Sequence, residues 1–566
     1  MEGVKGYIII IAVIFVFFAV QSVASKRARD ERMRKFLDKS FGKRPEREYK
    51  YEEYARIRYY FDSMALKNKA DIVDDITWND LSMDNIFMLI NHTNSSVGEE
   101  YLYNLLRTIN FDSEKLKEFD DLSEYFLNNP DKAKKLQYLF MELGRTRSIS
   151  FFDFIHRFND VKRKSNLIHY LCMALGFGVI GMFFVNPAIA VATLVVVFSF
   201  NIYTYYKEKS DVSNYFVCCK YLEGLTDTAK KIEAVEIPVI NRYRQKIKEL
   251  RGKLKYLEHN MYLISDGSMD GSIASVLLEY IKMLFHVDLI KFNSIVADTV
   301  DKLDIIDELY ETMGRLEAEL AVASFKKLLM DEYGAYAKAE VIRHGSKPFV
   351  EFEKLYHPMI ENAVKNSMGR EHAVLLTGSN ASGKSTFLKT VAINGILSQT
   401  IGIACGESFK MTEGLIYSSM ALRDDLESSE SYYIVEIKSL KRILDIAKTG
   451  RKPVMCFIDE VLRGTNTVER IAASSVILEK LSMMNTICFA ATHDIELTRL
   501  MEGSYKNYHF EEEVAKDDVL FNYCLRSGPA TTRNAIKLLR VIGYDSQIIK
   551  NASVRAEDFL NTGSWR

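Results

Sequence analysis

The sequence predicts an α/β domain of the P-loop type at the C-terminal end. An all-α region precedes it, with an inserted apolar helical hairpin and an N-terminal apolar helix. Three observations lead to this prediction. A short apolar segment at 373–377 runs into a glycine-rich loop and then a helical pattern. Long runs without charge occur at 6–25 and 165–206. Proline accounts for only 8 of 566 residues, which allows long uninterrupted helices.

The first apolar segment, 6–25, contains no charged residue and is long enough for a helix that crosses a bilayer. Lys26, Arg27 and Arg29 follow it. A cleaved signal peptide is the alternative, because Ser22-Val23-Ala24 resembles a cleavage site. We favour an uncleaved anchor at 1–25, since a dense basic flank holds that side in the cytoplasm. Residues 26–74 are then expected to form a charged juxtamembrane helical segment.

The second apolar run has 42 residues without Asp, Glu, Lys or Arg and is interrupted by Asn186-Pro187. It predicts a transmembrane hairpin at 167–206, with helices at 167–185 and 188–206. Basic residues flank both ends (Lys162, Arg163, Lys164, Lys207 and Lys209), so both ends are expected in the cytoplasm. The alternative is a buried hairpin in a soluble core. We favour three transmembrane helices, a lipid bilayer as partner, and a multi-pass cell-membrane protein whose other parts are cytoplasmic.

Composition excludes some classes of protein. Lysine plus arginine is 75 and aspartate plus glutamate is 76, which argues against a globally basic nucleic-acid coat protein and an acidic disordered tail. The seven cysteines form no CxxC pair, and the ten histidines have no metal-ligand spacing with them. We therefore expect reduced thiols and no structural metal.

A long helix is predicted near residues 303–320. Apolar residues recur there at steps of three and four (Leu303, Ile306, Leu309, Met313, Leu316 and Leu320). Acidic residues, including Asp307 and Glu317, are assigned to the solvent-exposed face of this helix.

A phosphate-binding loop follows the strand at 373–377. The pattern GxxxxGK[ST] occurs in the strand–loop–helix context that it requires, and its residues are Gly378, Ser379, Asn380, Ala381, Ser382, Gly383, Lys384, Ser385 and Thr386. Glycines let backbone N–H groups enclose phosphate, and the helix N-terminus adds its positive end. Lys384 would reach the β- and γ-phosphates, and Ser385 would ligate Mg²⁺. These features predict a P-loop NTPase that binds ATP.

Two further strands end in polar residues. Strand 454–458 ends in Asp459-Glu460, and strand 486–491 ends in Thr492-His493-Asp494. Because parallel strands present their carboxyl ends at one edge of a sheet, we expect these residues to meet the loop. Asp459 would hold Mg²⁺ with Ser385, Glu460 would polarise the attacking water, and His493 would sense the γ-phosphate. A structural role is the alternative for His493. The sequence thus predicts a Mg²⁺-dependent ATP hydrolase with Glu460, His493 and Lys384 as catalytic residues.

Residues 355–552 resemble the ATPase domain of the MutS family, which is similar to ABC-type ATPases. The segments that carry the resemblance are His357-Pro358, 377–386, Asp424-Asp425-Leu426, 431–436, 459–467 and 491–494. Upstream, 75–81 and 98–102 resemble the start of the family's helical core, and 321–325 resembles the end of its lever helices. The resemblance implies a helical core and lever domain at 75–345 and an ATPase domain at 346–566.

The resemblance also implies a homodimer with composite sites. Ser431, in the same signature segment as Asp424, would contact the γ-phosphate held by the other subunit. Val364 and Asn366 lie where the family approaches the adenine. Closure of the two ATPase domains would then move the helical levers.

The sequence departs from the mismatch repair members of the family. A mismatch-recognition domain and the Phe-x-Glu wedge have no counterpart, and Arg470 stands where those members tend to have a glycine. The first hypothesis is therefore a membrane-anchored, MutS-like dimeric ATPase that drives a helical clamp, with DNA as the expected ligand. The second is a mismatch repair or recombination protein that binds mismatched or branched DNA at the membrane. The third, an ABC-like transporter subunit, is disfavoured because three spans are few for a pathway.

Overall fold

The computed structural model describes residues 2–68, 71–109, 111–146, 149–161, 165–261, 280–343, 347–379, 382–420, 432–463, 465–514, 519–530, 536, 539 and 542–564. The chain divides into two compact units. The helical unit comprises Met1–Lys67, Asn91–Asn104 and Leu122–Phe325, and the sheet unit comprises Asn68–Ile90, Leu105–Asp121 and Lys326–Arg566.

The first part of the chain is helical, as expected, and α5, α6 and α14 contribute residues to both units. Its elements are α1 (Glu2–Ser40), α2 (Tyr51–Asn68), α3 (Asp75–Asp80), α4 (Met83–Ile90), α5 (Ser96–Arg107), α6 (Ser113–Asn128), α7 (Pro130–Leu143), α8 (Phe151–His156), η1 (Arg157–Asp160), α9 (Leu167–Met182), α10 (Pro187–Glu233), η2 (Pro238–Ile240), α11 (Asn241–Met261), α13 (Val287–Val300) and α14 (Leu303–Tyr333).

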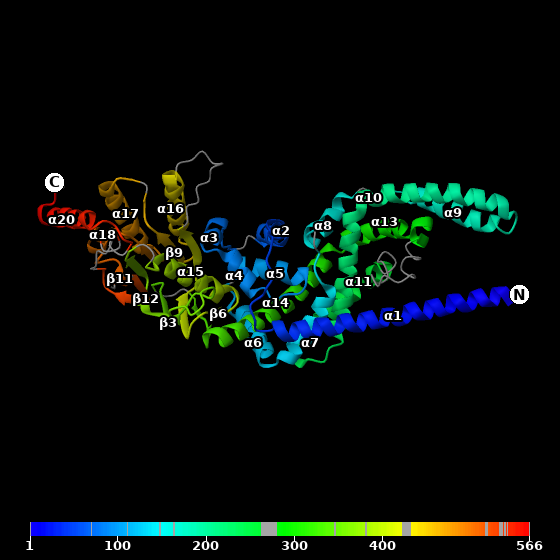
Figure 1. The fold of residues 1–566 in the computed structure, drawn as a ribbon, viewed down its shortest axis with the longest axis horizontal. Coiled ribbons are helices and arrows are strands. Elements are labelled where there is room, and N and C mark those ends of the chain that lie inside the picture. The colour runs from blue at the N-terminus through cyan, green and yellow to red at the C-terminus, as the bar shows by residue number, and fades with distance from the viewer. Residues whose placement is uncertain are drawn as a thin grey trace. The chain divides into compact units, whose positions relative to one another are not determined.

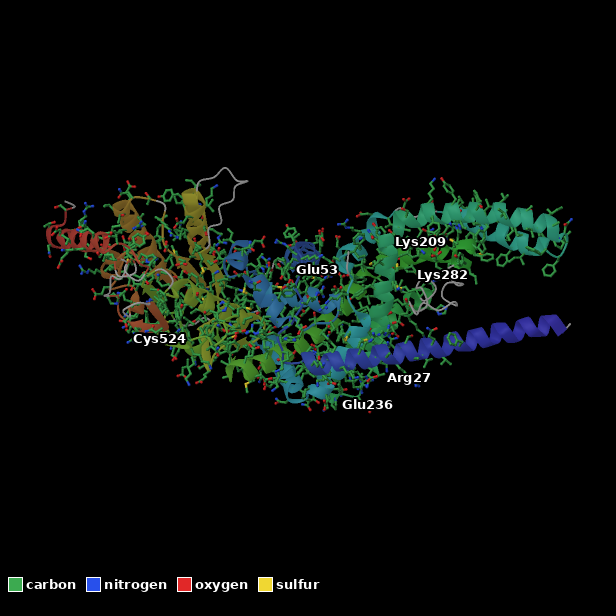
Figure 2. The ribbon with its side chains drawn as sticks, in the orientation of Figure 1. Arg27, Glu53, Lys209, Glu236, Lys282 and Cys524 are labelled. Atoms are coloured by element: carbon green, nitrogen blue, oxygen red, sulfur yellow. The ribbon has the colours of Figure 1, made fainter. Side chains whose placement is uncertain are left out.

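The hairpin predicted at 167–206 is built from α9 and α10, which lie side by side (Figure 1). Asn186 caps the start of α10, because its side chain accepts hydrogen bonds from the backbone N–H groups of Ala188 and Ile189. The second helix does not stop at Tyr206. It continues as one helix of 47 residues, and its C-terminal half packs in the core of the helical unit through Cys218, Leu222, Leu225, Ala229 and Ile232. Lys209, labelled in Figure 2, lies on α10 just beyond the apolar stretch.

Many apolar side chains of the hairpin are exposed rather than packed. Phe184 at the turn is 89% exposed, and Val196 on α10 is 69% exposed. Among the described residues, α10 is the helix that is long and apolar enough to cross a membrane, whereas α9 is apolar but has only 16 residues. In the most apolar 18-residue stretch of α10, 17% of the residues are buried. The anchor predicted at 6–25 lies within α1, and three transmembrane helices remain a prediction.

Helix α14 shows one expectation confirmed and one overturned. The apolar stripe packs in the core of the helical unit, and Ile306, Leu309, Met313 and Leu316 are fully buried. The assignment of Asp307 and Glu317 to the solvent-exposed face was wrong, because both are buried. Glu317 is fully buried. Its carboxylate accepts hydrogen bonds at the N-terminal end of α5, an interaction that periodicity within one helix could not reveal.

The sheet unit is an α/β domain with a central six-stranded sheet in the order β12-β11-β5-β10-β9-β8. The strands β11, β5, β10, β9 and β8 run parallel, and β12 pairs antiparallel with β11. The three strands expected from the sequence are therefore neighbours, with β10 between β5 and β9. The remaining strands form a four-stranded sheet, β2-β7-β3-β4, and a two-stranded one, β1-β6.

From β8 to β11 the strands and helices of the sheet unit alternate, as expected of such a domain. They are β1 (Ala337–Lys338), β2 (Glu340–Ile342), β3 (Val350–Leu355), β4 (Asn366–Glu371), β5 (Ala373–Thr377), α15 (Lys384–Thr400), β6 (Ile403–Ala404), β7 (Ser408–Thr412), β8 (Leu415–Ser419), α16 (Tyr432–Lys448), β9 (Val454–Asp459), α17 (Thr467–Ser482), β10 (Thr486–Ala491), α18 (Ile495–Leu500), β11 (Lys506–Val514), β12 (Val519–Ser527) and α20 (Ser546–Thr562).

Segments from the first quarter of the chain complete the sheet unit. Asp80 at the end of α3 accepts hydrogen bonds from the Ser418 hydroxyl (2.6 Å) and the Met420 N–H (3.0 Å) at the end of β8. Lys452, just before β9, pairs with Asp71 at 2.7 Å. The edge strand β8 is thus held by residues more than 300 positions away in the sequence.

Candidate nucleotide-binding site

The described residues of the loop between β5 and α15 have backbone features typical of a phosphate-binding loop. Gly378 has φ +145° and Gly383, at the start of α15, has φ +104°. A Cβ atom on Gly378 would lie 2.9 Å from both the Phe510 carbonyl oxygen and the Ser382 hydroxyl, so only glycine fits there. Lys384 Nζ donates hydrogen bonds to the carbonyl oxygens of Gly378 (2.8 Å) and Ser379 (2.7 Å), which link the first residues of the loop to the start of α15.

A cavity of about 520 Å³ opens beside this loop, within the range of small-molecule sites. Its walls come from the loop and the start of α15, the segment between β3 and β4, the carboxyl ends of β9 and β10, and the middle of β11 and β12. They include Tyr356, His357, Val364, Asn366, Ser382, Lys384, Ser385, Asp459, Glu460, His493, Phe510 and Tyr523. The structure therefore brings the predicted residues Lys384, Ser385, Asp459, Glu460 and His493 to one cavity.

Asp459, the last residue of β9, faces Ser385 in the first turn of α15. Burial raises the pKa of Asp459, and a hydrogen bond with the Ser385 hydroxyl together with the nearby Lys384 charge opposes this rise. A carboxylate next to a hydroxyl is the kind of oxygen pair through which proteins hold Mg²⁺ beside a phosphate. These two residues thus fit the predicted metal position.

Glu460 is held from two sides. Its Oε1 lies 2.8 Å from Nε2 of His493, and its Oε2 lies 2.9 Å from Nε of Arg463. The hydrogen bond from His493 is the main cause that lowers the pKa of Glu460, and electrostatic interactions with His493, Arg463 and Lys384 add to it. The group is therefore ionised at neutral pH, as a base that orients a water molecule must be.

Two contacts around Glu460 were not anticipated from the sequence. Glu436 on α16 accepts hydrogen bonds from the backbone of the turn that follows Glu460. Arg470, in the first turn of α17, makes a bidentate ion pair with Asp494, with distances of 2.9 and 2.6 Å. Arg470 had stood out in the sequence, but its partner could be found only in three dimensions.

Val364 and Asn366, which were expected near the adenine, line the cavity. Asn366 also makes hydrogen bonds that join two strands. Its amide donates to the Tyr523 carbonyl oxygen (3.1 Å) and accepts from the Leu525 N–H (2.7 Å), which ties β4 to β12. The ring of Tyr523 lies 3.0 Å from the point where a Cβ on Gly383 would be. Tyr523 therefore covers the loop from one side, a position that the sequence did not indicate.

Several predicted residues lie outside the described part of the chain, namely Asn380, Ala381, Asp424 and Ser431. The described residues fit a nucleotide nonetheless. The Ser382 hydroxyl lines the cavity, is buried, and has no hydrogen-bond partner among the described residues. An unpaired buried donor is costly, and a phosphate oxygen would satisfy it.

Comparison with known proteins agrees with this geometry. Residues 374–560 match the family model described as MutS domain V. The DNA mismatch repair protein MutS of Thermus thermophilus is 30% identical over 251 residues, which cover 42% of this chain and 30% of that protein. The MutS protein homolog 4 of Mus musculus is 26% identical over 285 residues, covering 48% of this chain and 29% of that protein. The chain thus spans about a third of the length of the curated relatives that it matches. Residues 374–560 are therefore similar to MutS domain V, the ATPase-containing C-terminal region of the MutS family.

Proposed function

We propose that this chain is a membrane-anchored, MutS-like ATPase that hydrolyses ATP with Mg²⁺ in the cavity of the sheet unit. One observation carries the proposal. Lys384, the Ser385–Asp459 pair and the Glu460–His493 pair converge on one cavity from the carboxyl ends of neighbouring strands. Binding groups for phosphate, metal ligands and a base are then present together, as phosphoryl transfer to water requires.

Each residue has a role that follows from its contacts. Lys384 and the Ser382 hydroxyl would bind phosphate oxygens, and Ser385 and Asp459 would hold Mg²⁺, which neutralises charge on the transferred phosphoryl group. Glu460 would orient the attacking water. A carboxylate has about four lone-pair positions, so it can accept from that water while it remains paired with His493 and Arg463.

The test is Glu460→Gln in the full chain. The amide keeps the shape of the side chain but cannot take a proton, so turnover should fall by roughly 100-fold or more while ATP still binds. Lys384→Ala is the comparison, since it should weaken ATP binding itself. Undiminished hydrolysis by the Glu460→Gln protein would show that the water is activated elsewhere.

Membrane anchorage is proposed from the exposed apolar surface of the hairpin. Large apolar side chains point outward along both α9 and the first half of α10, and Phe184 and Val185 are exposed at the turn. Tyr170, Tyr203 and Tyr206 are exposed near the other end, where aromatic residues typically meet lipid headgroups. This distribution of side chains fits a lipid bilayer. In the proposed arrangement, α9, the apolar half of α10 and the N-terminal part of α1 are three transmembrane spans. The sheet unit then lies in the cytoplasm.

The bilayer proposal can be tested with tryptophan probes in reconstituted vesicles. Val196→Trp places a probe on the apolar half of α10, and Val217→Trp places the same probe at an exposed site on the polar half. Lipids brominated on their acyl chains should quench the added emission of the first variant and not of the second. Equal quenching in both variants would contradict burial of the hairpin in lipid.

The ligand of the clamp is proposed from the names of the relatives, among them the DNA mismatch repair protein MutS. We propose a homodimer that binds DNA, with mismatched or branched DNA as the specific alternative to ordinary duplex. Filter binding at two salt concentrations, with and without ATP, tests this. Phosphate contacts predict a log–log slope of about −0.9 per contact. An affinity equal to that of a basic control peptide would exclude DNA as the ligand.

A further inference from the structure

The turn directly after β9 has an unusual backbone conformation. Glu460 has φ +60° and Leu462 has φ +58°, and neither is a glycine. Residues with a Cβ atom rarely adopt this left-handed backbone conformation, so it persists only where the surrounding structure imposes it. Something near this turn must therefore hold residues 460–463 in place.

Glu436 is the group that does so. It lies on α16, is 2% exposed, and places both carboxylate oxygens against the N–H of Arg463, at 3.1 and 3.2 Å. The N–H of Leu462 donates to it as well. Burial is the main cause that raises the pKa of Glu436, and these two N–H groups oppose the rise. The interactions described for this carboxylate thus converge on the backbone of one turn.

That turn determines where Glu460 points. Glu460 begins the turn and Arg463 ends it, and the two side chains form the ion pair of 2.9 Å. By fixing the N–H groups of Leu462 and Arg463, Glu436 holds the backbone beneath both members of this pair. The carboxylate of Glu460 is then kept facing His493 and the cavity.

We propose that Glu436 is a positioning residue for ATP hydrolysis, which holds the 460–463 turn so that Glu460 faces the attacking water. The inference rests on the proposed ATPase function. It assigns no contact with ATP to Glu436, so it predicts an effect on turnover and not on nucleotide affinity.

The same unit provides a matched control. Gln399 on α15 is also buried and also clamps a backbone turn, since its amide accepts from the Gly414 N–H (2.9 Å) and donates to the Gly414 carbonyl oxygen (3.0 Å). It does not line the cavity. Gln399→Ala therefore removes a comparable side chain–backbone clamp of the sheet unit without touching the turn after β9.

The experiment compares Glu436→Ala, Glu436→Gln and Gln399→Ala in the full chain. For Glu436→Ala we expect kcat to fall about 10- to 100-fold, because small misplacements of a catalytic group have effects of this size, while the Kd for ATP stays within about twofold. Glu436→Gln should recover part of kcat, since its amide oxygen can still accept from the turn. Gln399→Ala should keep kcat when rates are normalised to the folded fraction.

Hydrogen exchange gives a second measurement that does not depend on turnover. In Glu436→Ala, exchange should be faster in the peptide that covers 460–466 and unchanged in α15. A wild-type kcat in Glu436→Ala, or a parallel loss of ATP affinity, would overturn the positioning role. If the wild-type chain binds ATP without hydrolysing it, the proposed function fails. Separately, unchanged hydrogen-exchange protection of 460–466 in Glu436→Ala would overturn the claim that Glu436 holds the 460–463 turn in place.

Discussion

Glu317 joins two helices of the helical unit through a buried carboxylate. It accepts hydrogen bonds from the backbone N–H groups of Asn94 and Ser95 and from the Ser95 hydroxyl, directly before α5 begins. The side chain is fully buried, and burial raises the pKa of Glu317 to about 7. A carboxylate on α14 thus accepts from N–H donors at the N-terminus of α5. The helix itself offers no acceptor for the N–H groups at this end.

Removal of this carboxylate has a predictable magnitude. Glu317→Ala leaves two backbone N–H groups without their acceptor, at about 1–3 kcal/mol each, so we expect the start of α5 to lose roughly 2–6 kcal/mol of local stability. Glu317→Gln should lose little at pH 5, because its oxygen can accept from both N–H groups and its NH₂ can donate to the Ser95 hydroxyl.

The wild type and Glu317→Gln also differ in how their stability depends on pH. A raised pKa in the folded state means that the stabilisation is fully present below the unfolded pKa of 4.5 and is lost as the pH rises through about 7. At 1.36 kcal/mol per pKa unit, the wild type should lose about 3 kcal/mol across this window relative to Glu317→Gln, which does not titrate. Burial also raises the pKa of Glu100 to about 8, so the stability of both proteins has a further pH dependence that does not come from Glu317.

Hydrogen exchange of the first turn of α5 is the appropriate assay, because a chain of two units does not unfold in a single step. Wild type and Glu317→Gln are compared at the same pH, so that intrinsic exchange rates cancel. The ratio of their rates should change about 10- to 100-fold between pH 5 and pH 8. Glu319→Gln, a buried change on the same helix with Tyr243 and Arg315 as partners, should leave this turn unaffected. A ratio that does not vary with pH, or a Glu317→Gln protein that behaves like Glu317→Ala, would refute the assignment.

Two further predictions concern contacts that the same reasoning identifies. A Cβ on Gly98 would lie 2.1 Å from the Glu317 carboxylate, so Gly98→Ala should destabilise the helical unit by about 1–3 kcal/mol. The loss should be smaller in a Glu317→Ala background, and equal losses in a double-mutant cycle would contradict the contact. Arg470→Gly removes the bidentate pair with Asp494, the residue after His493, so ATP turnover should fall several-fold. Arg470→Lys should restore little of the turnover, because an ammonium cannot form the paired contact. Exchange of the two charges (Arg470→Asp with Asp494→Arg) should restore more. Full activity in Arg470→Gly would exclude a positioning effect.

The sequence could indicate which residues meet at the candidate site because its parts are local. A glycine-rich loop after an apolar strand, and carboxylates or a histidine at the ends of two further strands, are visible as short patterns. The sheet then brings Lys384, Asp459, Glu460 and His493 together, because parallel strands share one edge. The supporting contacts could not be found in this way. Glu436 meets Arg463 across 27 residues and Arg470 meets Asp494 across 24, and no spacing rule connects such pairs.

In the helical unit, periodicity identified the apolar face of α14 but misplaced a polar residue. A helical pattern separates apolar from polar side chains and cannot tell whether a polar one meets water or a buried donor. The same limit applies to α10. Loss of apolar character after Tyr206 marks the end of the predicted span, but the helix itself continues to Glu233 because its later residues, such as Leu222 and Ile232, pack in the core.

The continuity of α10 bears on how the hairpin would respond to the helical unit. A span joined by a flexible loop only tethers a protein, whereas α10 enters the core of the unit without a break. Side-chain bonds also fix the base of the hairpin to the segment that begins α13. The Asn201 amide donates to the Leu284 carbonyl oxygen (2.7 Å), the Tyr205 hydroxyl donates to Asp288 (2.7 Å), and Lys209 pairs with Asp288 (3.5 Å). Any rotation of the core of the helical unit must then either turn α9 and the apolar half of α10 with it or break these bonds. If ATP binding moves the helical core, and if α9 and α10 lie in a bilayer as we propose, the hairpin must move with that core against the lipid.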